Sequence, residues 1–200
     1  MFSIQTLSQF VEHNEILAHF LIFLGVIIEG ELVMITAGIL AHLGPISFWS
    51  AFTVGMIGAI AKSFLWYKFG VWMENKIPKN RFFTYVENKV LGFLPRFTTK
   101  PFWSIFASKF IYGVNHLTLI FAGFKKINIY TYMKAEFYSS LIWAIGILSL
   151  GYYLSYAAFG ITKDIRKFTL LILLFVIGFL ILERVISFFV ELLEKYFVEK

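Results

Sequence analysis

Residues 16–44 read ILAHFLIFLGVIIEGELVMITAGILAHLG, two apolar runs of 13 residues on either side of Glu29-Gly30-Glu31. A helix of about 13 residues is about 20 Å long, too short to cross a hydrocarbon core of about 30 Å. One continuous helix would instead place two carboxylates at its middle, each costing about 2.5 kcal/mol or more if it faced lipid. The pattern therefore predicts a re-entrant hairpin, which returns to its own side of a membrane, with Glu29 and Glu31 at a protein-buried tip.

The composition of the whole chain also predicts a membrane setting. Of the 200 residues, 59% are hydrophobic and 20% aromatic, whereas 15% are charged. A soluble domain averages about 45–50% apolar and about 25% charged residues, so the excess apolar surface is expected to face lipid. This excludes a soluble enzyme, and the net charge of +6 fits cytoplasmic loops better than nucleic acid. The chain has no cysteine, which excludes disulfides, thiol chemistry and Cys-ligated metal centres.

The other segments follow from length and polarity. Residues 74–101 carry six basic residues among aromatic and aliphatic ones, which predicts a basic amphipathic helix lying on an anionic leaflet. Residues 102–124 are apolar at both ends and polar at the centre, which predicts a second re-entrant hairpin. The segments besides the hairpins are an interfacial N-terminus (1–15), a spanning helix (45–73), the basic cytoplasmic loop (74–101), two more spanning helices (135–157 and 168–190) and a charged tail (191–200).

The two halves of the chain match, without a gap, when one is shifted by 85 positions. Over residues 32–67, Gly38 then falls on Gly123 and Tyr67 falls on Tyr152. The predicted fold class is an all-α membrane protein. It is an inverted repeat of two re-entrant hairpins, each followed by a transmembrane helix, plus a C-terminal transmembrane helix. Repeats of this kind usually place a transporter's site where the broken elements meet near the middle of the membrane.

The basic residues favour a hairpin rather than a span at 102–124. Lys62, Lys68 and Lys109 are left out of the count because they lie within or at the edge of apolar segments. With the hairpin, 12 of the other Lys and Arg residues lie inside and 3 outside, whereas a span gives 9 and 6. Because cytoplasmic loops carry the excess of basic residues, the first arrangement is preferred, and it predicts a cytoplasmic C-terminus.

Ionisable residues within apolar segments are functional candidates by default. Glu29 and Glu31 are expected to take up and release protons; the alternative is a structural ion pair or a cap at the tip. Lys62 lies deep in the span 45–73, where it is expected to pair with one of these acids or to anchor a phosphate. The alternative for Lys62 is an ion pair that only fixes helix packing.

A second group of candidates lies in the second hairpin, where Lys109, Asn115 and His116 gather around Gly113. An anionic phosphate needs positive charge and hydrogen-bond donors, and a broken helix adds exposed N–H groups. These four residues and Lys62 are therefore the predicted substrate-binding set. The alternative is that the Asn and His side chains only satisfy the broken backbone.

The remaining polar residues are expected to have structural roles. Glu136 is expected to neutralise Lys134, with a place in a proton path as the alternative. His19 and His42 lack metal-ligand spacing and are expected to pack, and no metal or other cofactor is predicted. The chain contains no Walker loop, GxSxG elbow or HExxH pair, so ATP-driven transport and hydrolase chemistry are not expected.

The chain resembles the DedA family, also called the SNARE-associated or VTT domain, over roughly residues 16–157. Residues 27–70, IIEGELVMITAGILAHLGPISFWSAFTVGMIGAIAKSFLWYKFG, look like the first half of that family. Residues 108–143, SKFIYGVNHLTLIFAGFKKINIYTYMKAEFYSSLIW, look like its arginine-bearing signature and the spanning helix that follows. The resemblance implies a bacterial inner-membrane protein that transports or flips lipids, notably the undecaprenyl-type polyprenyl-phosphate carrier or phospholipids, with the proton gradient as partner.

The sequence departs from the family pattern at charged positions. Ala61-Lys62 stands where the family often has Gly-Asp, and Lys109 stands where its signature opens with Arg. The second Arg of the signature is Asn115. Charge is thus redistributed relative to the usual Asp–Arg set.

The function expected from the sequence is movement of a phosphate-bearing lipid between leaflets, with proton coupling and without enzymatic activity. Its partners would be membrane lipids and protons. Two alternatives stay open: a proton-coupled transporter of a small ion or solute, and a non-transporting module that assembles membrane complexes. A lipid-modifying enzyme is the least favoured, because no nucleophile–base pair is visible.

Overall fold

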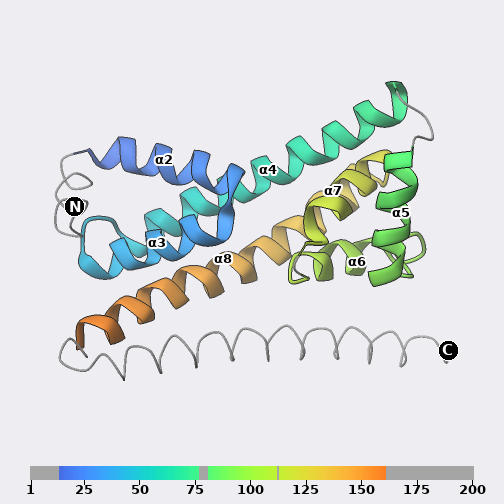
Figure 1. Cartoon of the computed structure of the whole chain (residues 1–200). Helices are drawn as coiled ribbons and strands as arrows, with labels where there is room; N and C mark the ends of the chain where they lie inside the picture. The colour runs from blue at the N-terminus through green and yellow to red at the C-terminus, as the bar shows by residue number, and fades with distance from the viewer. Residues whose placement is uncertain (1–13, 77–80, 112, 161–200) are drawn as a thin grey trace. The chain divides into compact units, whose positions relative to one another are not determined.

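Seven helices make up the part of the chain that the structure, a computed structural model, describes (Figure 1): residues 14–76, 81–111 and 113–160. Within these ranges there is no strand, which confirms the predicted all-α class. The helices are α2 (Glu15–Ile28), α3 (Gly30–Leu43), α4 (Phe48–Lys76), α5 (Arg81–Phe93), α6 (Pro101–Ser108), α7 (Asn115–Phe124) and α8 (Ile129–Gly160). Most of the predicted N-terminal segment, the span at 168–190 and the charged tail lie outside the described residues.

Among the described helices, α4 and α8 are long and apolar enough to cross a membrane. The apolar stretches are Phe48–Lys76 and Ile129–Tyr156, of 29 and 28 residues. At about 1.5 Å per residue, each is longer than the hydrocarbon core of about 30 Å. The structure therefore confirms two helices of the length and composition predicted for spans.

Helix α8 begins earlier than the predicted span at 135–157. The Asn128 side chain caps it, because Oδ1 accepts hydrogen bonds from the N–H groups of Tyr130 and Thr131 at 2.9 and 3.4 Å. Asparagine is among the preferred N-cap residues. This cap makes α8 begin at Ile129, before the predicted apolar stretch. Hydrophobicity alone does not locate this helix start.

The described residues form two compact units. One contains residues 14–63 and 140–160, and the other contains residues 64–76, 81–111 and 113–139. Helices α4 and α8 each contribute one half to each unit.

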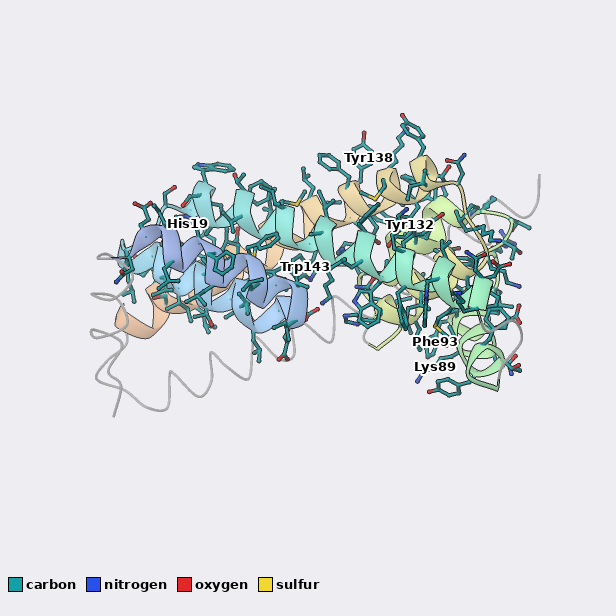
Figure 2. All side chains as sticks on the ribbon, turned by 90° about the horizontal axis from the view of Figure 1, so that it is seen from above. His19, Lys89, Phe93, Tyr132, Tyr138 and Trp143 are labelled. Atoms are coloured by element: carbon teal, nitrogen blue, oxygen red, sulfur yellow. The ribbon has the colours of Figure 1, made fainter. Side chains whose placement is uncertain are left out.

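In the first unit, one residue separates α2 from α3, and the two helices run back along each other (Figure 1). Glu29 is extended, with φ −142° and ψ 94°, so the helix predicted to break here does break. The following Gly30 lies against the ring of Trp143 on α8, which a Cβ on Gly30 would approach to 2.9 Å. Trp143 is labelled in Figure 2. The absence of a side chain at position 30 thus lets the hairpin tip pack on α8.

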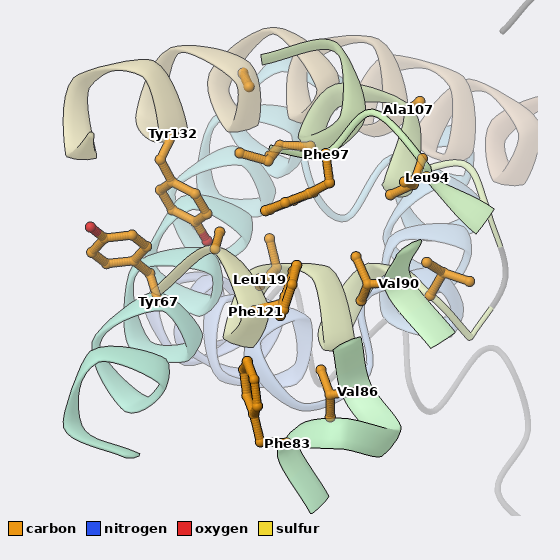
Figure 3. Packing of buried hydrophobic residues seen from close by; sticks show 14 residues of the cluster. Tyr67, Phe83, Val86, Val90, Leu94, Phe97, Ala107, Leu119, Phe121 and Tyr132 are labelled. Carbon is orange, nitrogen blue, oxygen red and sulfur yellow. The ribbon is translucent and has the colours of Figure 1, made fainter. Parts of the chain in front are cut away.

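In the second unit, the apolar core lies between α5, α7 and their neighbours (Figure 3). Helix α5 turns Phe83, Val86 and Val90 into this core, and the ring centroids of Phe83 and Phe124 are 3.6 Å apart. The spacing of these three residues is that of one helical face. The predicted amphipathic helix thus exists over Arg81–Phe93, and its apolar face is buried against α7. Its contact with an anionic leaflet stays a prediction. Periodicity predicts that a face is buried; it does not identify what buries it.

The packing of α5 gives a testable difference between two aromatic residues. Phe83→Ala is expected to lower the free energy of unfolding by about 3–5 kcal/mol, because it removes a buried ring from the core. Tyr85→Ala, at a position that is 55% exposed, is expected to change it by about 0.5 kcal/mol or less. Denaturation of the purified protein in detergent micelles measures both. Equal effects would mean that α5 is held by its outer face instead.

Two helix crossings are made by main chain against main chain. In the first unit, a Cβ on Gly38 of α3 would collide with the carbonyl oxygen of Leu148 on α8. In the second unit, a Cβ on Gly123 of α7 would collide with the carbonyl oxygen of Tyr67 on α4. Glycine is therefore required at both crossings for steric reasons.

Candidate functional site

A buried ion pair joins the end of α6 to α8 in the second unit. Lys109 Nζ lies 2.8 Å from Glu136 Oε2, and the two side chains are 6% and 0% exposed. Removing both charges from water costs free energy, and only a close contact between the ammonium and the carboxylate offsets that cost. The expectation that Glu136 neutralises Lys134 is wrong, because Lys134 is exposed and the Glu136 carboxylate faces Lys109 instead.

The break between α6 and α7 positions Lys109. Helix α6 begins at Pro101, where the missing N–H of proline is tolerated, and it ends at Ser108. The chain then continues in turns, in which the N–H of Phe110 donates to the Ala107 carbonyl at 3.0 Å. Gly113 has φ +73°, a left-handed conformation that glycine adopts without strain. The predicted interruption at the centre of 102–124 is therefore present.

The first turn of α7 brings the other predicted residues to this break. Asn115 is the first residue of α7, and the exposed His116 lies edge-on to Trp66 of α4, with ring centroids 5.8 Å apart. Asn115 Oδ1 and Thr118 Oγ1 are buried and have no hydrogen-bond partner among the described residues. Because most buried polar atoms have a partner, these two atoms mark a place for water or a polar ligand.

The two acids of the first hairpin are not buried. Glu29 and Glu31 are both exposed, and so are Ile28 and Leu32 beside them, at 80% and 60%. The protein-buried tip predicted for the two acids is therefore wrong. Gly30 takes the buried position at the tip, because only a residue without a side chain fits against Trp143. The acids on either side of it consequently face outward.

Lys62 lies in the half of α4 that belongs to the first unit and is half-buried. Its neighbour Ser63 is buried and donates a hydrogen bond to the Ala59 carbonyl at 2.9 Å. The pairing of Lys62 with Glu29 or Glu31 stays a prediction, as does its role in holding a phosphate.

The histidine of α3 packs against aromatic rings as predicted, but its buried Nδ1 has no hydrogen-bond partner among the described residues. The His42 ring lies edge-on to the rings of Tyr152 and Tyr156 on α8, at centroid distances of 4.9 and 5.6 Å. Over the described ranges, no group of three or more His, Cys, Asp or Glu side chains is placed to hold a metal ion.

Glu136 is the residue that the sequence reasoning left out of the site. A signal for it exists, because it is the only acidic residue between Glu87 and Asp164. A lysine buried in an apolar segment needs an opposite charge, and Glu136 is the only acid that this stretch provides for Lys109. Lys134, which is close to Glu136 in sequence, is the partner that proximity predicts, whereas the actual partner, Lys109, is 27 positions away.

The break between α6 and α7 therefore combines a buried cation, its carboxylate partner and two buried polar oxygens. A lysine ammonium binds phosphate as a point charge, so Lys109 supplies the positive charge for an anion once it is released from Glu136. Comparison of the chain with protein-family models, curated proteins and solved structures finds no match.

Proposed function

We propose that this chain is an integral membrane transporter that moves a phosphate-bearing lipid between leaflets, in the manner of the DedA family that it resembles. The observation that carries the proposal is Lys109, whose side chain is only 6% exposed at the break of a helical hairpin. An ionisable residue within a membrane is rare and usually belongs to a substrate or ion pathway. The substrate is a polyprenyl phosphate or a phospholipid whose phosphate binds the Lys109 ammonium.

Aromatic residues on α6 favour a lipid over a free anion. Successive ring contacts join Phe102 to Phe106 on α6 at 6.4 Å, and Phe106 to Phe110, two residues beyond the end of α6, at 5.7 Å between centroids. Trp103 extends the strip and is 59% exposed. The strip ends beside Lys109, so an isoprenyl or acyl tail has an apolar surface next to the cation that binds its head group.

Two re-entrant hairpins in an inverted repeat are part of the same proposal. Gly38 and Gly123, which the shift of 85 positions matches, both pack on a long helix. Gly38 meets α8 in the first unit, and Gly123 meets α4 in the second. Each hairpin thus packs on the long helix that comes from the other half of the sequence, which supports a repeat. In this arrangement Lys62, Glu29 and Glu31 belong to the first half of the transport path.

Proteoliposomes test the proposal directly. The purified chain is reconstituted with a labelled polyprenyl phosphate, and movement between leaflets is followed by the accessibility of the label. We expect the wild type to speed this movement, and Lys109→Ala to reduce the rate roughly tenfold or more, because the head group loses its charge partner. Lys126→Ala is the control, because Lys126 forms an exposed ion pair with Glu74 in the same unit.

Two outcomes would contradict the proposal. Movement of the labelled lipid at the rate of protein-free vesicles would exclude lipid transport. Uptake of free inorganic phosphate without lipid movement would instead favour the solute transporter.

A further inference from the structure

We propose that Glu136 is a tethered competitor for Lys109, so that a lipid phosphate binds there only as Glu136 takes up a proton. This inference rests on the proposed function, in which Lys109 binds the phosphate, and adds the group that controls the binding. The proton is thus assigned to the buried Glu136 of the second unit, and not to the exposed Glu29 or Glu31 at the hairpin tip of the first unit.

The charges of the second unit single out this carboxylate. The described part of that unit contains three acids, Glu74, Glu87 and Glu136. The first two pair with Lys126 and Lys125, at 2.6 and 2.7 Å, and these pairs are partly exposed. Glu136 is 0% exposed and faces Lys109. Among the described residues of this unit, Glu136 is therefore the acid that a ligand of Lys109 must displace.

Displacement changes the charge balance of the site. One buried ammonium cannot neutralise a carboxylate and a phosphate at once, and two anions that share one cation in a low dielectric repel each other strongly. Glu136 is fixed on α8 and has no exposed surface, so its negative charge is removed by protonation. A proton from water is added to the Glu136 carboxyl as a phosphate oxygen takes the place of Oε2 at Lys109 Nζ.

The other ionisable groups of α7 and of residues 132–136 of α8 are Tyr132, Lys134 and His116. Tyr132, on α8 itself, packs against Tyr67 of α4 with ring centroids 4.6 Å apart, and a tyrosine ordinarily ionises near pH 10. Lys134, also on α8, is exposed. On α7 the one ionisable side chain is His116. His116 is thus the competing candidate for the proton, and the test has to separate it from Glu136.

The test counts protons during binding. Geranyl phosphate, a short isoprenyl phosphate, is titrated into the full chain in detergent micelles at pH 8. Calorimetry in two buffers with different heats of ionisation gives the number of protons taken up. We expect the wild type to take up about one proton more per bound phosphate than Glu136→Gln does. Glu136→Gln is expected to bind roughly tenfold more tightly or better, because the competing carboxylate is gone.

Three further variants make the assignment specific. His116→Gln is expected to keep the extra proton, Glu136→Asp is expected to keep it as well, and Glu74→Gln is expected to match the wild type. The inference is overturned if the wild type takes up no extra proton, if His116→Gln abolishes the uptake, or if Glu136→Gln binds no more tightly. If Glu136→Gln does not fold, the number of protons taken up by the wild type and by Glu136→Asp decides. Both are expected to take up the extra proton, and its absence in the wild type overturns the inference.

The outcome separates this inference from the proposed transport. Proton-linked binding without lipid movement in vesicles would leave the role of Glu136 standing and refute transport. Lipid movement with phosphate binding that takes up no proton would refute the role of Glu136 and leave transport standing.

Discussion

Lys109→Met is expected to lower the free energy of unfolding by about 3–5 kcal/mol, because it leaves the Glu136 carboxylate buried without its partner. The loss follows from the burial of the pair, whose side chains are 6% and 0% exposed at a separation of 2.8 Å. Adding Glu136→Met to the same chain is expected to recover most of the loss, since two apolar residues often replace a buried pair at little cost. Unfolding in mixed micelles, followed by circular dichroism, gives all the values needed for a double-mutant cycle.

The matched control is an exposed pair in the same unit. Lys126→Met removes the partner of Glu74, and those two side chains are 55% and 31% exposed. Exposed pairs contribute about 0–1 kcal/mol, so this variant is expected to stay close to the wild type. A loss no larger for Lys109→Met than for Lys126→Met would show that the buried pair does not hold α6 to α8.

Gly123→Ala is the second substitution with a large expected effect. A Cβ at this position would collide with the main-chain carbonyl of Tyr67 on α4, and a main-chain atom cannot turn aside as a side chain can. Overpacking of this kind typically costs about 1–3 kcal/mol, and the steric conflict here places the expected loss at the upper end of that range. The same unfolding measurement applies.

Gly146→Ala provides the opposite expectation. Gly146 lies within α8, and no atom of another element in the described part of the chain lies within 4 Å of a Cβ built on it. Alanine is favoured over glycine in a helix by about 1 kcal/mol, so this variant is expected to be slightly more stable than the wild type. Equal losses for Gly123→Ala and Gly146→Ala would mean that the contact of Gly123 with the main chain of Tyr67 does not set the cost of the substitution.

Local patterns were sufficient to predict the helix breaks. Glu29-Gly30-Glu31 interrupts an apolar run, and Lys109 and Gly113 interrupt another, and the helices end at both places. Such breaks are predictable because polar side chains and glycine act on the backbone next to them. The apolar sequence also predicts that α4 and α8 are long helices, whereas the start of α8 is set by the Asn128 cap.

The partners of the charged groups were not predictable in this way. Glu136 binds a lysine 27 positions away, and no periodicity relates the two residues. At the first tip, the identity of the buried residue depends on Trp143, which lies more than a hundred positions further along the chain. Both outcomes are set by tertiary packing, which one-dimensional patterns do not contain.

The glycine crossings also bear on how this sequence can change over evolution. Where side chains fill an interface, a loss on one helix can be offset by a gain on the other. At Gly38 and Gly123 the backbones touch directly, so no compensating replacement exists. In a library of all single substitutions, we expect tolerance at these two sites to depend on volume alone, with serine and alanine as the least harmful replacements.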